Sequence, residues 1–298
     1  MFFYGEEERH YVLRYNGESG LRLMPSDHDL YLIGDQHLGN IGYFEGGLEK
    51  AYDSVLAAPN RFVVQMGDRI DCITWHDKRY DHATRRMIPH QQTKEAIKQD
   101  ARVAERTLTY LIGNHEAKLS AEVNFTEMMC DEAGCPYGNF TSILEMHDKH
   151  GFMYSVFVTH GFGQLTSNAK DREQQLANMK ASLKMKLREE AGNCLLMAMG
   201  HTHQLFVVEP THRLYLTYED QDGPVQHYQE HDYAQPQKQF IDIDCRWYAN
   251  TGSFLKKYPK YGAFPGYVEL RGYKPSELGY VVAHVRDRKI VSVERVVV

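Results

Sequence analysis

Seven polar side chains that could bind metal ions each follow a short apolar stretch of the sequence. Carboxylate, imidazole and amide groups are the ligands that divalent ions such as Mn²⁺, Fe²⁺ and Zn²⁺ accept, and no thiolate is among them. Seven ligands are too many for one ion, whereas two ions about 3.5–4 Å apart that share one carboxylate would use them all. The residues are Asp35, His37, Asp68, Asn114, His160, His201 and His203.

The apolar stretches before these residues are typical of buried strands that alternate with helices. The helical segments span 45–60, 93–108 and 169–192, and this alternation predicts βα units. Ligands of open α/β sheets gather beyond the carboxyl ends of the strands, so we expect the polar clusters to converge on one site. The stretches are "LYLIGDQH", "FVVQMGD", "LTYLIGNHE", "YSVFVTHG" and "LLMAMGHTH".

Two of the clusters hold a pair of candidate ligands separated by one residue. Asp35 and His37 form one pair, and His201 and His203 form the other. Side chains two positions apart point to the same side of an extended chain. We therefore expect each pair to face the site together from an extended turn.

The predicted secondary structure changes in the second half of the chain. From Gln204 onward strands and turns dominate, with a hairpin signal at Asp222-Gly223, and the final segment predicts two more strands. No linker, repeat or low-complexity tract divides the sequence. We expect one domain over 1–298, with insertions near 72–99 and 211–246.

The composition narrows the class of protein. The 298 residues carry a net charge of −6 with 42% hydrophobic residues, which excludes a globally basic nucleic-acid coat but leaves room for a local basic groove. No apolar run approaches the ~20 residues of a membrane span, and the first residues do not resemble a signal peptide. Five scattered cysteines without a C-x-x-C motif favour reduced thiols. We expect a cytoplasmic protein with no membrane partner, and the sequence sets no oligomeric state.

A second metal site is conceivable at Cys130, Cys135, His147 and His150, whose spacing approaches that of zinc fingers. The two histidines are closer together than that spacing prefers. The segment "GCPYGNF" also reads as a turn that enters a strand. Buried thiols and surface imidazoles are the favoured interpretation.

Taken in order, the polar clusters resemble a known family. The motifs "GDQH", "GDRID", "GNHE", "THG" and "GHTH" are similar to those of the calcineurin-like metallophosphoesterases, whose pattern is D-x-H, G-D-x-x-D, G-N-H-[DE], H and G-H-x-H. "ANTGSF" at 249–254 also resembles the Asn-Pro-Gly-Ser segment of that family, with Thr251 in place of proline. The resemblance covers residues 30 to 254. It implies an α/β fold, a four-layer αββα sandwich of two mixed β-sheets flanked by helices.

The resemblance also implies roles for individual residues. It places Asp35, His37 and His203 on one ion, and Asn114, His160 and His201 on the other. Asp68 would bridge the two ions. His115 becomes the catalytic histidine and Asp71 the carboxylate that orients it.

The implied activity is that of a metal-dependent phosphoric ester hydrolase. Two divalent ions lower the pKa of a bridging water, and the resulting hydroxide attacks phosphorus. His115 would donate a proton to the leaving group. Mn²⁺ is the expected metal, with Fe, Zn, Ni or Mg also compatible.

The substrate class rests on one departure from the family pattern. Protein phosphatases of the superfamily continue their second motif as Asp-Arg-Gly, whereas Asp71 is followed here by Cys72 and Ile73. The missing arginine favours a phosphodiester, with a nucleotide or single-stranded nucleic acid as the expected substrate. A phosphomonoesterase remains an alternative. So does a non-catalytic scaffold on the same fold, although the chain retains every motif residue.

Three basic or histidine-rich segments could border the substrate. Residues of 72–99 could hold phosphates or stack bases, although a solvated helix is favoured; they are Trp75, His76, Lys78, Arg79, His82, Arg85, Arg86 and His90. His227 and His231 have helical metal spacing, but an exposed strand or loop is favoured there. Lys256, Lys257 and Lys260 form a modest patch that is equally consistent with a solvated edge.

Overall fold

A computed structural model of the chain describes residues 11–77, 80, 87–211, 213–217, 226–230, 240–258, 272, 275 and 277–298. Several predicted features lie outside these residues: the turn at Asp222-Gly223, and Lys78, Arg79, His82, Arg85, Arg86, His231 and Lys260. Among the described residues, no helix has the length and apolar character needed to span a membrane.

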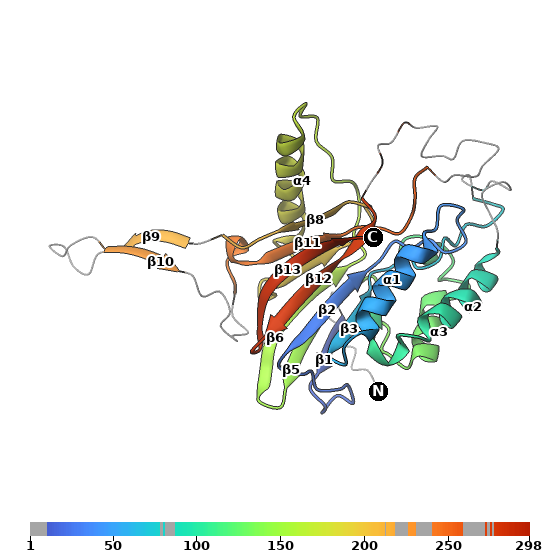
Figure 1. Ribbon diagram of the computed structural model, residues 1–298, viewed down its shortest axis with the longest axis horizontal. Coiled ribbons are helices and arrows are strands. Elements are labelled where there is room, and N and C mark those ends of the chain that lie inside the picture. Colours follow the sequence, from blue (N-terminus) through green and yellow to red (C-terminus); the bar gives the residue numbers. More distant parts are fainter. Residues whose placement is uncertain are drawn as a thin grey trace.

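Two mixed β-sheets form the centre of the fold (Figure 1). The first has the strand order β1-β5-β6-β7-β11-β8, with β6 parallel to β7 and β7 parallel to β11. Its strands are β1 (Tyr11–Tyr15), β5 (Thr141–Asp148), β6 (Gly151–Thr159), β7 (Leu196–Met199), β11 (Trp247–Thr251) and β8 (Leu205–Val208).

The second sheet has the order β13-β12-β2-β3-β4, in which β2, β3 and β4 run parallel. Its strands are β13 (Lys289–Val297), β12 (Gly279–Arg286), β2 (His28–Ile33), β3 (Arg61–Gln65) and β4 (Thr107–Tyr110). The five predicted strands are confirmed as β2, β3, β4, β6 and β7. The two strands predicted at the end of the chain are β12 and β13.

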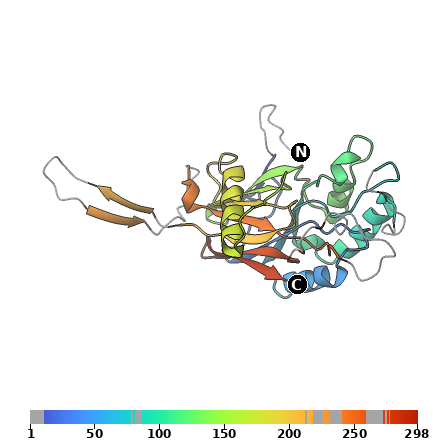
Figure 2. The ribbon, with the colours of Figure 1, turned by 90° about the horizontal axis from the view of Figure 1, so that it is seen from above.

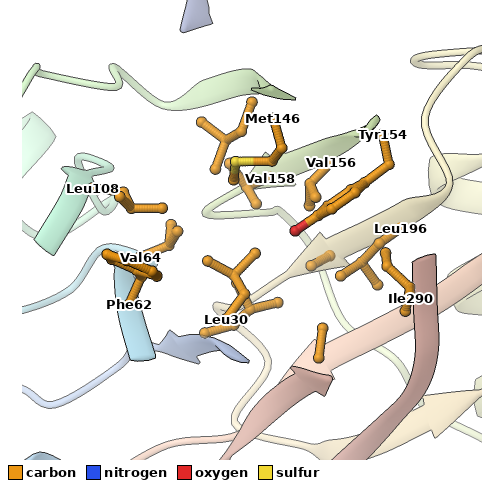
Figure 3. Packing of buried hydrophobic residues seen from close by; sticks show 14 of the residues in the cluster. Leu30, Phe62, Val64, Leu108, Met146, Tyr154, Val156, Val158, Leu196 and Ile290 are labelled. Atoms are coloured by element: carbon orange, nitrogen blue, oxygen red, sulfur yellow. The ribbon is translucent and has the colours of Figure 1, made fainter. Parts of the chain in front are cut away.

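The main hydrophobic core lies between the two sheets (Figure 3). Leu30 and Val64 from the second sheet pack in one cluster with Val156 and Leu196 from the first. Successive residues of a strand face opposite sides, so Tyr31, next to Leu30, belongs instead to the cluster under helix α1. Strand β2 is consequently buried on both faces, which explains the apolar run from Leu30 to Ile33.

Helices cover the outer face of each sheet. Helix α1 (Glu45–Leu56) packs through Ala51 and Val55 against the second sheet, and α4 (Arg172–Leu187) packs through Leu183 and Leu187 against the first. The shorter helices α2 (Pro89–Asp100) and α3 (Phe125–Ala133) contact each other beside β4. The predicted four-layer arrangement of helices around two mixed sheets is confirmed.

Two details of the helices differ from the sequence prediction. The helix expected over 93–108 begins earlier, at Pro89, and ends at Asp100, because a 3-10 turn (η1, Ala104–Arg106) leads into β4. The helix expected over 169–192 is shorter, Arg172–Leu187, and of its leucines Leu183 and Leu187 are buried whereas Leu176 is exposed.

A two-stranded antiparallel ribbon, β9 (Arg213–Thr217) and β10 (Gln226–Glu230), stands apart from both sheets. Figures 1 and 2 show it projecting away from the sandwich. The two paired strands of the predicted hairpin are confirmed, whereas its turn lies outside the described residues. His227 lies on β10, so the helical metal spacing considered for it is wrong and the alternative of a strand is correct.

Candidate metal centre

Five loops that follow buried strands meet at one edge of the sandwich. Three follow β2, β3 and β4 of the second sheet, and two follow β6 and β7 of the first. Among the described residues, three groups of side chains could hold a metal ion: Asp35 with His37 and His203, Asp68 with His160 and His201, and His37 with Asp71 and His115. Both sheets contribute to each of the first two groups.

The first two loops are held together by their backbones. The amides of Asp35 and His37 donate to the carbonyls of Gly67 and Asp68, each at 2.9 Å, and Leu38 donates to Arg69 at 3.1 Å. These bonds continue the parallel pairing of β2 and β3 beyond the ends of the strands. The side chains of Asp35, His37 and Asp68 are thereby fixed relative to one another.

The first group converges through nitrogen and oxygen atoms alone. His37 Nε2 lies 3.1 Å from His203 Nε2, and His203 Nε2 lies 3.3 Å from Asp35 Oδ1. Asp35 is fully buried, and its Oδ1 forms no hydrogen bond. Two ligands bound at 2.0–2.2 Å to the same ion at roughly right angles would lie about 3 Å apart. The spacing of this group therefore fits a divalent ion.

The second group has Asn114 at its centre. Asn114 Oδ1 lies 2.7 Å from His201 Nδ1 and 3.0 Å from His160 Nε2. Asp68 Oδ2 lies 3.5 Å from His160 Nε2 and also 3.7 Å from His37 Nε2 of the first group. One carboxylate oxygen thus faces both groups, and all seven predicted ligands are brought together.

The backbone at four of the seven candidate ligands, the members of the two pairs, differs from the sequence prediction, and Asp68 shares their conformation. Asp35, His37, Asp68, His201 and His203 have φ between 50° and 67°, in the left-handed region. Each pair does face the site together, but through left-handed turns and not through an extended chain. The left-handed conformation costs a residue with a Cβ atom about 1–2 kcal/mol, and such residues concentrate at functional sites.

The charges around Asp68 keep the carboxylates of the site ionised. Burial raises the pKa of Asp68, but the nearby His160 and His115 hold it well below its usual range. Burial also raises the pKa of Asp35, but the close contact with His203 and its charge outweigh burial, so the pKa of Asp35 is lowered. Ionised carboxylates are the form that binds cations.

The histidines divide into two kinds. Burial and then the charge of His115 lower the pKa of His37 well below its usual value, and burial also lowers the pKa of His201. For His160 burial is outweighed by the negative charge of Asp68, which raises its pKa to about 10. His160 therefore holds a proton at neutral pH that a metal ion has to displace.

His115 is positioned mainly by backbone groups. Its Nδ1 donates to the carbonyl oxygen of Asp71 at 2.6 Å, and the Asp71 carboxylate Oδ1 is farther away at 3.4 Å. Its amide donates to Asp68 Oδ1 at 2.9 Å. The contact predicted between Asp71 and His115 is present, although the shorter contact is to the main chain of Asp71.

Glu116 ties two of the loops together, a role that the sequence prediction missed. Its Oε1 accepts from the amide of Ile70 at 3.0 Å and its Oε2 from the amide of Gly113 at 3.1 Å. Burial and the charge of Asp68 raise the pKa of this carboxyl to about 7. The sequence signal for this role is the acidic residue that ends the "GNHE" motif, directly after His115.

A buried ion pair anchors the Asp68 loop to helix α2. Arg69 Nη2 donates to Asp100 Oδ1 at 2.8 Å, and the hydroxyls of Tyr52 and Tyr110 donate to the same carboxylate at 2.6 and 3.1 Å. Both members of the pair are almost inaccessible to solvent. The arginine of the "GDRID" motif is therefore held inside the protein.

The alternative zinc site is absent from the groups that could hold a metal within the described part of the chain. Cys130 is buried in α3, in the cluster around Tyr110, whereas His150 is exposed. All five cysteines lie within the described residues and all are free, as the sequence indicated.

The chain matches no protein-family model and no curated protein. The function is therefore argued from the geometry and chemistry of the site.

Proposed function

We propose that this chain is a calcineurin-like metallophosphoesterase that hydrolyses phosphodiesters at a centre of two divalent metal ions. The position of Asp68 Oδ2 carries the proposal: it lies 3.7 Å from His37 and 3.5 Å from His160, between two groups of ligands. One oxygen shared between two groups is the arrangement of two-metal hydrolases. Mn²⁺ is the metal that we expect, with Fe, Zn, Ni or Mg as alternatives.

When bound, the two ions supply a hydroxide near neutral pH and offset negative charge on the phosphoryl oxygens. The ligands from the chain fix where these charges sit. Asn114 contributes a neutral oxygen between His160 and His201, which limits the negative charge of the centre. His115 is held by its Nδ1, so its Nε2 is the nitrogen available to give a proton to the leaving oxygen.

The preference for a diester rests on where the cations of the Asp68 loop lie. Cys72 and Ile73, which replace the Arg-Gly of protein phosphatases, are 2% and 5% exposed. Arg69 is engaged by Asp100, so its guanidinium cannot grip a substrate phosphate. A monoester dianion needs such compensation more than a diester, which carries one charge. The loop therefore suits the less charged substrate.

An exposed aromatic residue supports a nucleotide or a nucleic acid as the substrate. Trp75 is 74% exposed and its ring lies 3.8 Å from that of His76, in a turn that the Asp77 amide closes on Thr74. Lys118, on the 3-10 turn η2 (Glu116–Lys118) directly after His115, binds Asp77 at 3.0 Å. The turn is thus tied to the segment that carries His115, where a base could stack on the indole ring.

Rates on matched aryl mono- and diesters with Mn²⁺ test this function. We expect the diester to be cleaved faster, and His115→Ala to abolish most turnover while two ions remain bound. Cleavage of the monoester alone would favour the phosphomonoesterase alternative. Two bound ions without cleavage of either ester would indicate a scaffold.

A further inference from the structure

The carboxylate of Asp71 lies between two histidines of the centre. Its Oδ1 is 3.4 Å from His37 Nδ1 and 3.4 Å from His115 Nδ1, and the residue is 1% exposed. His37 faces the first ligand group with its other nitrogen, Nε2. A single oxygen of Asp71 therefore contacts a candidate metal ligand and the candidate catalytic residue at the same time.

The second oxygen of Asp71 is taken up by Asn40. Asn40 Nδ2 donates to Asp71 Oδ2 at 3.2 Å, and Asn40 Oδ1 accepts from the amide of Gly42 at 2.9 Å. An amide N–H can only donate, so the contact with Gly42 fixes which end of the Asn40 side chain is oxygen. The NH₂ group must therefore face Asp71.

The backbone of Asn40 is tied to the same loop. Its amide donates to the carbonyl oxygen of His37 at 3.0 Å, and its carbonyl accepts from the amide of Tyr43 at 3.1 Å. The side chain is thus held at a fixed distance from His37. Its Nδ2 therefore contacts Asp71 from a position that is fixed by the loop that carries His37.

The geometry points to Asn40 as a positioning residue that acts through Asp71 on both His37 and His115. This inference rests on the proposed two-metal function. By occupying Oδ2, Asn40 keeps Oδ1 directed at the two rings. The negative charge of that oxygen, 3.4 Å from His37 Nδ1 without a hydrogen bond to it, favours the form of His37 that carries its proton on Nδ1 and offers Nε2 to an ion. Loss of such an outer partner typically reduces metal affinity or activity 10–100-fold.

Two substitutions separate this role from a merely structural one. Asn40→Asp keeps an oxygen to accept from Gly42 but replaces the donor to Asp71 with a second carboxylate, whereas Asn40→Ala removes both contacts. We expect both variants to lose about 10–100-fold in kcat, and to bind Mn²⁺ more weakly by calorimetric titration. If Asn40 serves only the turn, Asn40→Asp will match the parent and Asn40→Ala alone will be impaired, which would overturn the inference.

The control is Asn16, whose side-chain oxygen accepts from the amides of Glu18 and Ser19 at 3.1 Å in an exposed turn. Asn16→Asp makes the same chemical change outside the centre and should leave kcat and Mn²⁺ affinity as in the parent.

A double variant tests whether Asn40 works through Asp71. In an Asp71→Asn background the partner is already altered, so adding Asn40→Ala should cost no more than about 2-fold further in kcat or in metal affinity. Independent, multiplying losses would overturn the inference, and this comparison still decides if Asn40→Asp fails to fold. Metal affinity is measured without substrate. A protein that binds Mn²⁺ but cleaves no phosphoester would thus refute the proposed function while the role of Asn40 is still tested.

Discussion

A catalytic histidine and a metal-ligating histidine differ in what their removal leaves behind. His115 contacts Asp71 and Asp68 through its Nδ1 and its amide, but it belongs to neither of the first two ligand groups. We expect His115→Ala to lower kcat by about 10²–10⁴-fold, because it removes a proton donor and no ligand. Metal content and steady-state rates measure the two effects, with His150→Ala, at an exposed position, as the control. Loss of metal from His115→Ala would contradict the assigned role.

His160 makes metal binding dependent on pH. Asp68 raises the pKa of His160 to about 10, so the metal-free centre holds a proton there at pH 7 that an ion displaces. Metal affinity should therefore rise with pH below about 10, by up to tenfold per pH unit for one released proton, and fall as the pH is lowered. Titration calorimetry in buffers of different ionisation enthalpy would detect the released proton. A titration without proton release between pH 7 and 8 would contradict this.

The side chains of the site were predictable from the sequence, but their backbone was not. Residue type and order identified the seven side chains that the fold brings together, because carboxylates and imidazoles after five buried strands form a ligand set for divalent metal ions. The left-handed turns at residues such as Asp35 and His37 escaped prediction, since D-x-H also fits an extended chain and neither residue is a glycine. Asn40 and Glu116 were missed as positioning residues because only the fold brings their partners close.

At the scale of elements, every strand that ends in a candidate ligand was predicted, whereas some elements without one were not. β1 and α3 were not predicted, and neither carries one of the seven candidate ligands. Helix α3 nevertheless has local signals: the Asn124 side chain accepts from the amide of Glu127, and Gly134 ends the helix with a φ of 65°. Its nine residues give too few turns for a clear helical period.

The turn that carries Trp75 should decide which diesters are good substrates. Stacking on an aromatic side chain contributes about 1–3 kcal/mol per base. We expect Trp75→Ala to lower kcat/KM at least 5-fold for a dinucleotide, and less than 2-fold for a diester whose groups are methyl and p-nitrophenyl. Phe240→Ala, also at a highly exposed aromatic, is the control. An equal loss on both substrates would show that the indole does not bind a base.

For the whole molecule, stability depends on the core between the sheets. Leu30 is fully buried there, and Leu30→Ala should lower the free energy of unfolding by about 2–5 kcal/mol. Urea denaturation of the metal-loaded protein measures this loss. Leu23→Ala, at a residue that is 46% exposed, should change it by less than about 1 kcal/mol. Equal losses in the two variants would contradict the assignment of the core.

Each of the first two ligand groups draws its members from both sheets. Asp35 and Asp68 follow strands of one sheet, whereas His160, His201 and His203 follow strands of the other. In the proposed centre each ion would consequently cross-link the two sheets. The sheets could then not separate at this edge without the loss of ligands from both ions. Chelation should then loosen the sandwich from this end, with faster amide exchange at the ends of β6 and β7 than at the opposite ends of the same strands. The centre that would cleave a phosphoester bond would thus also hold the two sheets together at this edge.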